Sequence, residues 1–323
     1  MARGRLSGLD SLRGIAAVVV LTYHVLAGYG TNGFLAVDFF FMLSGYVMAR
    51  TYEHRLGEPG AGGRFVMARI ERLWPPMVLA SLVGLPWLWW HVPDRALHVA
   101  IANLLLLPTP TPDDIYLLNP PAWSILFELI ANGVHAAILW RLSNRQLVGL
   151  LAVLVPLLTW FAFAYTMHMV TPDHLFTRGM VRLLCPYVIG VLLYRCWRDE
   201  PPLRVPPAVS WALLPAFFIG GNWLWGSIWL PDLLFVLVLC PLAIAGGLTM
   251  PASRLGSWLG AISFPLYAIH GPLLMLMREF GWSLPVQFVF ALGGGIAFTG
   301  LLAGIARLMK RVDNSAPAVL REA

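Results

Sequence analysis

Long apolar stretches follow one another along almost the whole chain, and they limit the possible folds more than any other feature. A helix that crosses a bilayer needs about 20 mostly apolar residues, because no water reaches its backbone polar groups there. Of the 323 residues, 59% are hydrophobic and 12% charged, and the mean hydropathy is +0.73. Soluble domains carry about 25% charged residues. We therefore predict an all-α polytopic membrane protein, with one membrane domain over residues 1–310 and a cytoplasmic tail over 311–323.

Ten stretches are predicted to cross the membrane, so both termini lie on one side. Ala96–Leu107 is apolar but too short to span, and we expect an outer-surface or re-entrant helix there. The first span is expected to be retained rather than cleaved as a signal peptide, because no small-residue cleavage site follows it. The predicted spans are Leu12–Tyr29, Phe34–Ala49, Trp74–Trp90, Trp123–Trp140, Leu147–Thr166, Met180–Cys196, Val209–Trp223, Ser227–Gly246, Trp258–Met277 and Val286–Leu308.

The basic residues predict the orientation of these spans. With the N-terminus in the cytoplasm, 18 of the 22 basic residues fall in cytoplasmic segments. Lys and Arg concentrate on that side of membrane proteins. The net charge of +6 is scattered between apolar segments, which indicates topology and argues against a nucleic-acid partner. We expect both termini in the cytoplasm and a bacterial inner membrane location.

The sequence lacks the motifs of several other kinds of protein chemistry. The three cysteines, Cys185, Cys196 and Cys240, have no paired spacing typical of a disulfide framework or a metal site. No P-loop, zinc-ligand pattern or Gly-x-Ser-x-Gly elbow occurs, which argues against a nucleotide-hydrolysing pump and a serine hydrolase. No internal repeat of the kind found in many transporters is visible either. We predict no bound metal and no bound cofactor.

Ionisable groups inside predicted spans are functional candidates, because burying them in lipid is costly. Arg13 and His24 are eleven residues apart, which brings them to nearly the same helix face, with His24 about 16 Å further along the axis. An anionic carrier held at Arg13 would place its reactive end near His24. The alternative is an orientation charge and a packing histidine, and the spacing leaves both open.

Two further arginines, Arg69 and Arg72, are three residues apart and share one face if the segment is helical. Guanidinium groups suit phosphate oxygens. Positive-inside charge and lipid headgroup binding explain the pair equally well.

Two polar residues near the start of the fourth predicted span, Ser124 and Glu128, are one helical turn apart. The carboxylate either orients a sugar hydroxyl, caps Ser124 or pairs with Arg182. We favour the functional interpretation, because a carboxylate in a membrane helix is costly.

The second and ninth spans each contain one more candidate. Asp38 either polarises His24 or makes a structural pair. His270, near the outer end of the ninth span, is either a substrate-binding group or a buried hydrogen-bonded histidine.

These residues resemble the motifs of the acyltransferase-3 family of membrane O-acyltransferases. Arg13 and His24 match the family's first-helix Arg and His, Arg69 and Arg72 its cytoplasmic Arg-x-x-Arg, and Ser124 with Glu128 its Ser-x-x-x-Glu. The matching stretches, in family order, are Leu9 to His24, Asp38 to Gly45, Arg69 to Pro75, Trp123 to Glu128 and Ser263 to His270.

The resemblance implies ten membrane helices, a cytoplasmic acyl-CoA donor, most often acetyl-CoA, and a carbohydrate or glycolipid acceptor at the outer face. It makes His24 the catalytic residue, with Asp38 or Glu128 orienting it or the acceptor. Arg13, Arg69 and Arg72 would hold the donor, and Ser124, Glu128 and His270 the acceptor. Some relatives carry an extracytoplasmic hydrolase-like domain, which we expect to be a separate partner protein here if transfer needs one.

Two functions of other classes stay open at this stage. A transporter or flippase for a glycolipid or polysaccharide precursor would use the same polar groups to bind cargo without making a bond. A noncatalytic membrane scaffold is disfavoured by the number of intramembrane ionisable groups.

Overall fold

The structure is a computed structural model that describes residues 6–26, 32–109, 115–167, 174–225 and 229–315, with the backbone alone for 219–225 and 312–315. Within these residues all regular structure is helical, which confirms the predicted class. The helices are α1 Ser7–Val25, α2 Ala36–Tyr52, α3 Ala61–Ser81, α4 Leu85–His91, α5 Ala96–Leu104, α6 Ala122–Ala137, α7 Asn144–Tyr165, α8 Leu175–Trp197, α9 Pro207–Trp225, α10 Trp229–Leu234, α11 Cys240–Thr249, α12 Arg254–Glu279 and α13 Leu284–Ser315.

Six helical segments of the described chain are long and apolar enough to cross a membrane. Within the described residues the remaining predicted spans are also helical, but they fall short in length or apolarity there. The end of the first predicted span, residues 27–29, and most of the predicted tail lie outside the described residues. The count of ten and the side of the termini stay predictions. The six segments are Gly33–Tyr52, Asn144–Tyr165, Leu175–Trp197, Trp229–Thr249, Arg254–Glu279 and Leu284–Arg311.

The third predicted span differs most from the structure. Its helix, α3, begins at Ala61, well before the predicted start at Trp74, and ends at Ser81; a 3₁₀ turn and the short α4 follow. The apolar stretch predicts a span from Trp74, next to Pro75 and Pro76. The helix instead continues through both prolines, as membrane helices tolerate.

Two other predicted segments change in detail. The eighth predicted span is divided into α10, a π-helical turn Phe235–Leu239 and α11. Pro241, at the start of α11, has no N–H to donate, and the π turn accommodates that loss. Ala96–Leu107 contains the short helix α5, which packs against α4; whether it enters the membrane stays a prediction.

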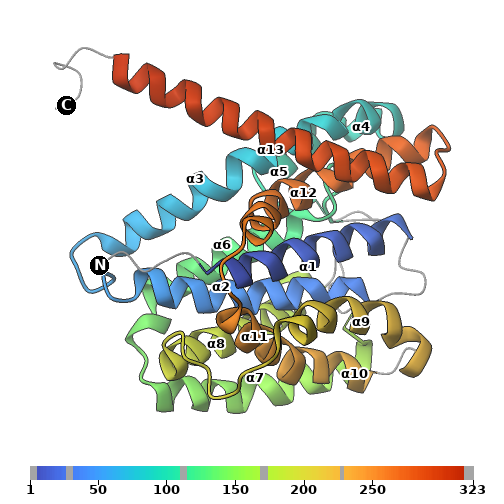
Figure 1. Ribbon diagram of the computed structural model, residues 1–323. Helices are drawn as coiled ribbons and strands as arrows, with labels where there is room; N and C mark the ends of the chain where they lie inside the picture. The colour runs from blue at the N-terminus through green and yellow to red at the C-terminus, as the bar shows by residue number, and fades with distance from the viewer. Residues whose placement is uncertain (1–5, 27–31, 110–114, 168–173, 226–228, 316–323) are drawn as a thin grey trace.

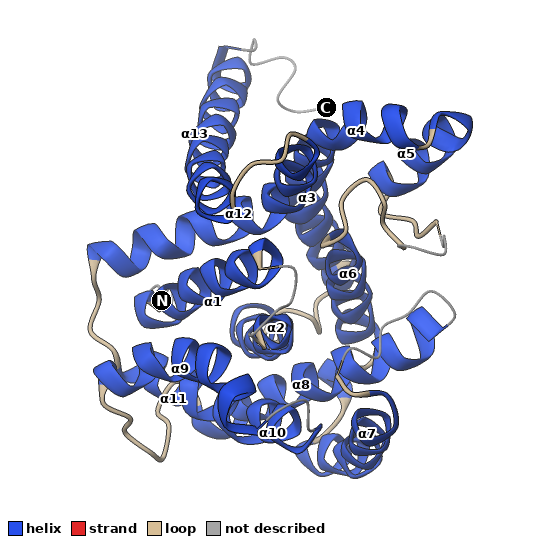
Figure 2. Ribbon diagram, turned by 90° about the vertical axis from the view of Figure 1, so that its right-hand side faces the viewer, coloured by secondary structure: helices blue, strands red, loops and turns tan. Residues whose placement is uncertain are grey.

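The two most buried long helices, α1 and α2, lie at the centre of the molecule. Figure 2 views α2 end-on and α1 obliquely, with α12, α3, α6, α8, α9 and α11 around them. α1 contacts α12, α11 and α9, and α2 contacts α8 and α6. α7 and α13 lie at the periphery, and most residues of both are exposed, α13 running along one edge over α12 (Figure 1). The core therefore surrounds the two helices that carry Arg13, His24 and Asp38.

Close packing of α1 against α12 depends on glycine. A Cβ at Gly14 would lie 2.5 Å from the Cβ of Leu259, and one at Gly260 would lie 2.5 Å from the Cβ of Asp10. Small residues let membrane helices approach closely, because van der Waals packing replaces the hydrophobic effect there. This contact continues along the two helices to His24 and His270.

Candidate active site

A cavity of about 660 Å³ is lined by residues of α1, α2, α3, α6, α12 and α13. It extends along α2 from Arg50 to Val37, a distance of about 20 Å at the helical rise per residue. Its walls are apolar over much of their area, and its charged groups gather in one part. The charged and hydroxyl-bearing lining residues are Asp10, Arg13, Ser44, Arg50, Arg69, Arg72, Ser124, Glu128, Ser263 and Tyr267.

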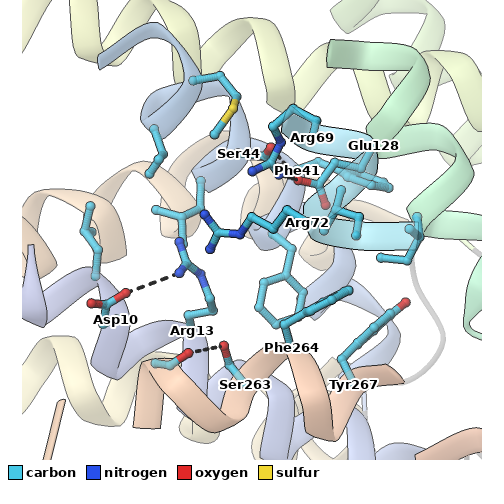
Figure 3. Close-up of a pocket in the computed structure, with 18 of the residues that line it drawn as sticks. Asp10, Arg13, Phe41, Ser44, Arg69, Arg72, Glu128, Ser263, Phe264 and Tyr267 are labelled. Atoms are coloured by element: carbon cyan, nitrogen blue, oxygen red, sulfur yellow. Dashed lines mark hydrogen bonds and ion pairs between the residues drawn. The ribbon is translucent and has the colours of Figure 1, made fainter. Parts of the chain in front are cut away.

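Most of the lining charges are paired. Arg69 and Glu128 form an ion pair of 2.6 Å, and the Ser44 hydroxyl donates to the same Glu128 oxygen at 2.9 Å. Arg13 pairs with Asp10 at 3.2 Å, one turn earlier on α1. Figure 3 shows both pairs on the cavity wall. Glu128 therefore pairs with Arg69 rather than with Arg182, the partner considered from the sequence.

Arg72 is the exception among these charges. Arg50, the fourth lining arginine, pairs with Asp199 at 2.7 Å, whereas Arg72 makes no ion pair or hydrogen bond with any described residue. Figure 3 shows it pointing into the cavity near Arg13. Desolvation by the surrounding protein and the nearby charge of Arg69 lower the pKa of the Arg72 guanidinium, which Glu128 partly offsets. Because the other lining arginines are paired with carboxylates and Arg72 is not, the cavity lining carries an excess positive charge.

A second polar group in this wall also lacks a partner. The Nε atom of Arg69 is buried and unpaired among the described residues, although a buried N–H without a partner costs about 1–3 kcal/mol. Arg69 and Arg72 lie on α3 and both line the cavity, so they share a helix face, as the sequence predicted. Together they offer N–H donors that suit a bound anion.

A hydroxyl pair lies at another part of the cavity. The Ser124 and Tyr267 oxygens are 2.6 Å apart, and both hydroxyls lie 3.1 Å from the Pro121 carbonyl oxygen. Phe40 packs edge-on against the Tyr267 ring, with 6.0 Å between ring centroids. Phe40 and Tyr267 both line the cavity.

His24 does not line the cavity; it contacts His270, which in turn contacts the lining residue Tyr267. Its Nδ1 atom is 3.0 Å from the Val20 carbonyl oxygen and 3.1 Å from the Nε2 atom of His270. The His270 ring in turn lies 5.6 Å from the Tyr267 ring. The structure thus brings together two histidines that are far apart in the sequence, next to the aromatic end of the cavity.

Asp38 lies in a separate buried cluster. Its carboxylate accepts from Arg182 at 2.7, 3.1 and 3.3 Å, and Arg182 also donates to the carbonyl oxygens of Met167 and Phe34. Asp38 is fully buried and Arg182 is 3% exposed. Of the two alternatives for Asp38, this geometry favours the structural pair over contact with His24.

The cavity thus unites most of the candidates chosen from the sequence. Arg13, Arg69, Arg72, Ser124 and Glu128 all line it, whereas His24, His270 and Asp38 do not. Sequence reasoning gave no role to five polar lining residues. All but Arg50 lie within a stretch that matches the family: Asp10, Ser44, Arg50, Ser263 and Tyr267.

Apolar helices packed around an internal cationic cavity define this chain as a multi-pass integral membrane protein. Comparison with known proteins specifies its family: a family model described as an acyltransferase domain matches residues 6–304. The chain belongs to the acyltransferase-3 family and is an acyltransferase, which confirms the resemblance found in the sequence.

Three relatives illustrate the range of the similarity. The chain is 25% identical over 299 residues to a protein of Komagataeibacter xylinus named as the membrane-bound transacylase BcsY, covering 84% of this chain and 73% of the relative. It is 27% identical to the exopolysaccharide production protein ExoZ of Rhizobium meliloti strain 1021, covering 86% and 88%. A protein of Staphylococcus aureus strain COL named as an O-acetyltransferase is 35% identical over 78 residues, covering 24% and 13%. No solved structure matches the chain.

Proposed function

We propose that this protein transfers an acyl group, most simply acetyl, from cytoplasmic acyl-CoA to a hydroxyl of a carbohydrate or glycolipid at the outer face of the bacterial inner membrane. The observation that carries the proposal is the unpaired Arg72, beside Arg13 and the unpartnered Nε of Arg69, in a long cavity whose walls are apolar over much of their area. A polyanion on a thin arm matches that combination of charge and shape.

Both parts of the donor, the charged nucleotide and the pantetheine arm, suit this cavity. The 3′,5′-ADP and pyrophosphate of coenzyme A carry several negative charges, which guanidinium groups bind through charge-assisted hydrogen bonds. The pantetheine arm would then follow the apolar wall along α2. In this arrangement Glu128 holds the Arg69 guanidinium in place through their ion pair.

The acyl group is proposed to react at His24. The Nε2 atom of a neutral imidazole accepts the proton of the acceptor hydroxyl while the hydroxyl oxygen attacks the thioester carbonyl carbon. The new carbon–oxygen bond forms, the carbon–sulfur bond breaks, and the thiolate receives the proton from His24 to leave as the thiol. A transient acyl-histidine would give the same products in two steps.

Phe40 and Tyr267 act as a gate in this proposal, because both rings line the cavity and the Tyr267 ring contacts the ring of His270, the neighbour of His24. The thioester passes them when the two rings swing apart. Rotation of aromatic side chains is compatible with turnover, since many enzymes move side chains or loops during catalysis.

The names of two relatives support the carbohydrate acceptor. One is named for exopolysaccharide production and one as an O-acetyltransferase. On this basis we propose a surface polysaccharide or its membrane-bound precursor as the acceptor, with Ser124 as a candidate acceptor contact. A separate extracytoplasmic partner would complete transfer if the acceptor lies far from the membrane.

A transport function is the alternative to be tested. The purified protein in proteoliposomes is given acetyl-CoA with and without a crude envelope-glycan acceptor, and free thiol is measured. Acceptor-dependent thiol release supports transfer. Movement of glycan across the membrane without thiol release, together with no binding of acetyl-CoA, would contradict the proposal and favour a flippase.

Substitution of Arg72 tests the donor site. Arg72→Ala is expected to weaken acetyl-CoA binding about 10–100-fold, because a hydrogen bond to a charged group contributes about 1.5–3 kcal/mol. Turnover at saturating donor is expected to change little. Titration of donor binding by calorimetry measures the effect.

Arg64→Ala is the matched control for Arg72→Ala. Arg64 lies on the same helix but is exposed and pairs with Glu58 at 3.6 Å outside the cavity, so its loss is expected to leave binding unchanged. Equal affinities for the Arg72 variant and the wild type would remove Arg72 from the donor site.

Substitution of Phe40 tests the gate. Phe40→Trp is expected to lower acceptor-dependent thiol release about 10–100-fold, because a bulkier ring misplaces the reacting thioester, while acetyl-CoA binding persists. Phe290→Trp, on the exposed face of α13, is the control for added aromatic bulk. Thiol release at the wild-type rate in the Phe40 variant would show that the thioester does not pass this ring.

A further inference from the structure

The contacts that His24 and His270 make with backbone carbonyl oxygens indicate which ring nitrogens carry protons. The Nδ1 atom of His270 is 3.1 Å from the Leu266 carbonyl oxygen, so this nitrogen must carry a hydrogen to avoid facing one lone pair with another. In the neutral ring, its Nε2 atom is then an acceptor. The Nε2 atom of His270 faces the Nδ1 atom of His24 at 3.1 Å.

The same reasoning applies to His24. Its Nδ1 atom faces two acceptors, the Val20 carbonyl oxygen at 3.0 Å and the Nε2 atom of His270. Only a hydrogen on Nδ1 satisfies both, which leaves the lone pair of the neutral His24 ring on Nε2. No described residue forms a hydrogen bond with this Nε2 atom.

From this geometry we propose that His270 is the positioning residue for His24. Its Nε2 atom shares the Nδ1–H of His24 with the Val20 carbonyl oxygen, holds the His24 ring in one orientation, and stabilises the positive charge that develops when the Nε2 atom of His24 takes a proton. His270 thereby has a role other than the acceptor contact expected from the sequence. This inference rests on the proposed function, in which His24 is the base.

The surroundings suit a neutral partner in this position. His270, a residue of α12, is 1% exposed and contacts His24 of α1. Tyr23 and Tyr267 present aromatic rings to the two histidines, and the Arg278 guanidinium donates to the His24 carbonyl oxygen at the end of α1. A carboxylate would be costly to bury here, whereas a neutral imidazole is an acceptor at lower cost.

The proton balance of the step leaves His270 unchanged. The acceptor hydroxyl proton moves to the Nε2 atom of His24 and then to the departing thiolate, as the carbon–oxygen bond forms and the carbon–sulfur bond breaks. The Nδ1 hydrogens of both rings stay in place. During the step the hydrogen bond between the rings becomes charge-assisted, and such bonds are stronger than neutral ones.

Two substitutions separate the hydrogen bond from packing. His270→Leu keeps much of the volume but removes the acceptor, and it is expected to lower kcat about 10–100-fold, as for other residues that orient a functional histidine, with little change in KM for acetyl-CoA. His270→Gln places an amide oxygen near the former Nε2 position and is expected to restore most of kcat. Leu274→Ala, buried on the same helix, is the control for lost packing against α1.

The kinetic outcomes decide the proposal. Equal losses in the Leu and Gln variants would overturn the acceptor role, and so would wild-type kcat in the Leu variant. A rise in KM without a change in kcat would instead make His270 a substrate contact.

A spectroscopic measurement tests the same hydrogen bond without turnover. ¹⁵N NMR of the histidine rings in wild-type protein is expected to show His24 protonated at Nδ1. In His270→Leu the same tautomer is expected, because the Val20 carbonyl oxygen still faces Nδ1, but the Nδ1 resonance is expected to shift because the imidazole acceptor is gone. A wild-type spectrum with the hydrogen on Nε2 would overturn the inference. If the wild type releases no thiol while the His24 tautomer with its hydrogen on Nδ1 is observed, the proposed function fails and the positioning contact stands.

Discussion

Replacement of His24 with alanine is expected to lower acceptor-dependent thiol release by about 10²–10⁴-fold, the usual contribution of a general base. Donor binding is expected to persist, because His24 lies outside the cavity that contains the arginines. The measurement combines thiol release from acetyl-CoA with equilibrium binding of the donor to wild type and variant.

The control for this variant is His98→Ala, which removes an exposed histidine of α5. It is expected to keep wild-type binding and turnover. Wild-type turnover in His24→Ala would contradict a catalytic role for the ring. Loss of donor binding to the same extent as turnover would place His24 in the donor site instead.

The second large effect is expected at Asp38 and concerns stability. Asp38→Ala leaves the buried Arg182 guanidinium without its counter-charge, and breaking such a pair costs about 3–5 kcal/mol. The expected result is a lower melting temperature and a smaller yield of folded protein in detergent. Thermal unfolding of the purified protein measures the change.

The double variant Asp38→Leu, Arg182→Met separates a structural role from a catalytic one. It removes both charges, and replacing a buried ion pair with apolar residues is often neutral or stabilising, so much of the lost stability is expected to return. Glu58→Ala is the control, because its pair with Arg64 is exposed and worth at most about 1 kcal/mol. An Asp38→Ala protein that is as stable as wild type but inactive would favour the catalytic role predicted from the sequence.

Local patterns were sufficient to predict the helices and several of the site residues. Apolar stretches of the length of a membrane span predicted helices, and the structure contains a helix at each predicted span. The spacing of Arg69 and Arg72 predicted a shared helix face, and both line the cavity on α3. Helix periodicity depends only on neighbours in the chain, so the sequence contains it directly.

Local patterns did not predict where α3 begins and ends. The polar segment after Ala61 carries charged residues typical of a loop, yet it is helical. Its buried Phe65 and Arg69 face the rest of the protein, and tertiary packing overrides the local signal.

What the sequence determined by itself was the class of protein, the helical segments, and the side chains that lie on one face of each helix. Only the tertiary structure decided which polar groups meet: Glu128 with Arg69, Asp38 with Arg182, and His270 with His24. These residues lie on different helices, and close packing at small residues decides which helix faces touch. The same packing leaves Arg72 unpaired in the cavity, because the two carboxylates of the lining, Asp10 and Glu128, already have partners.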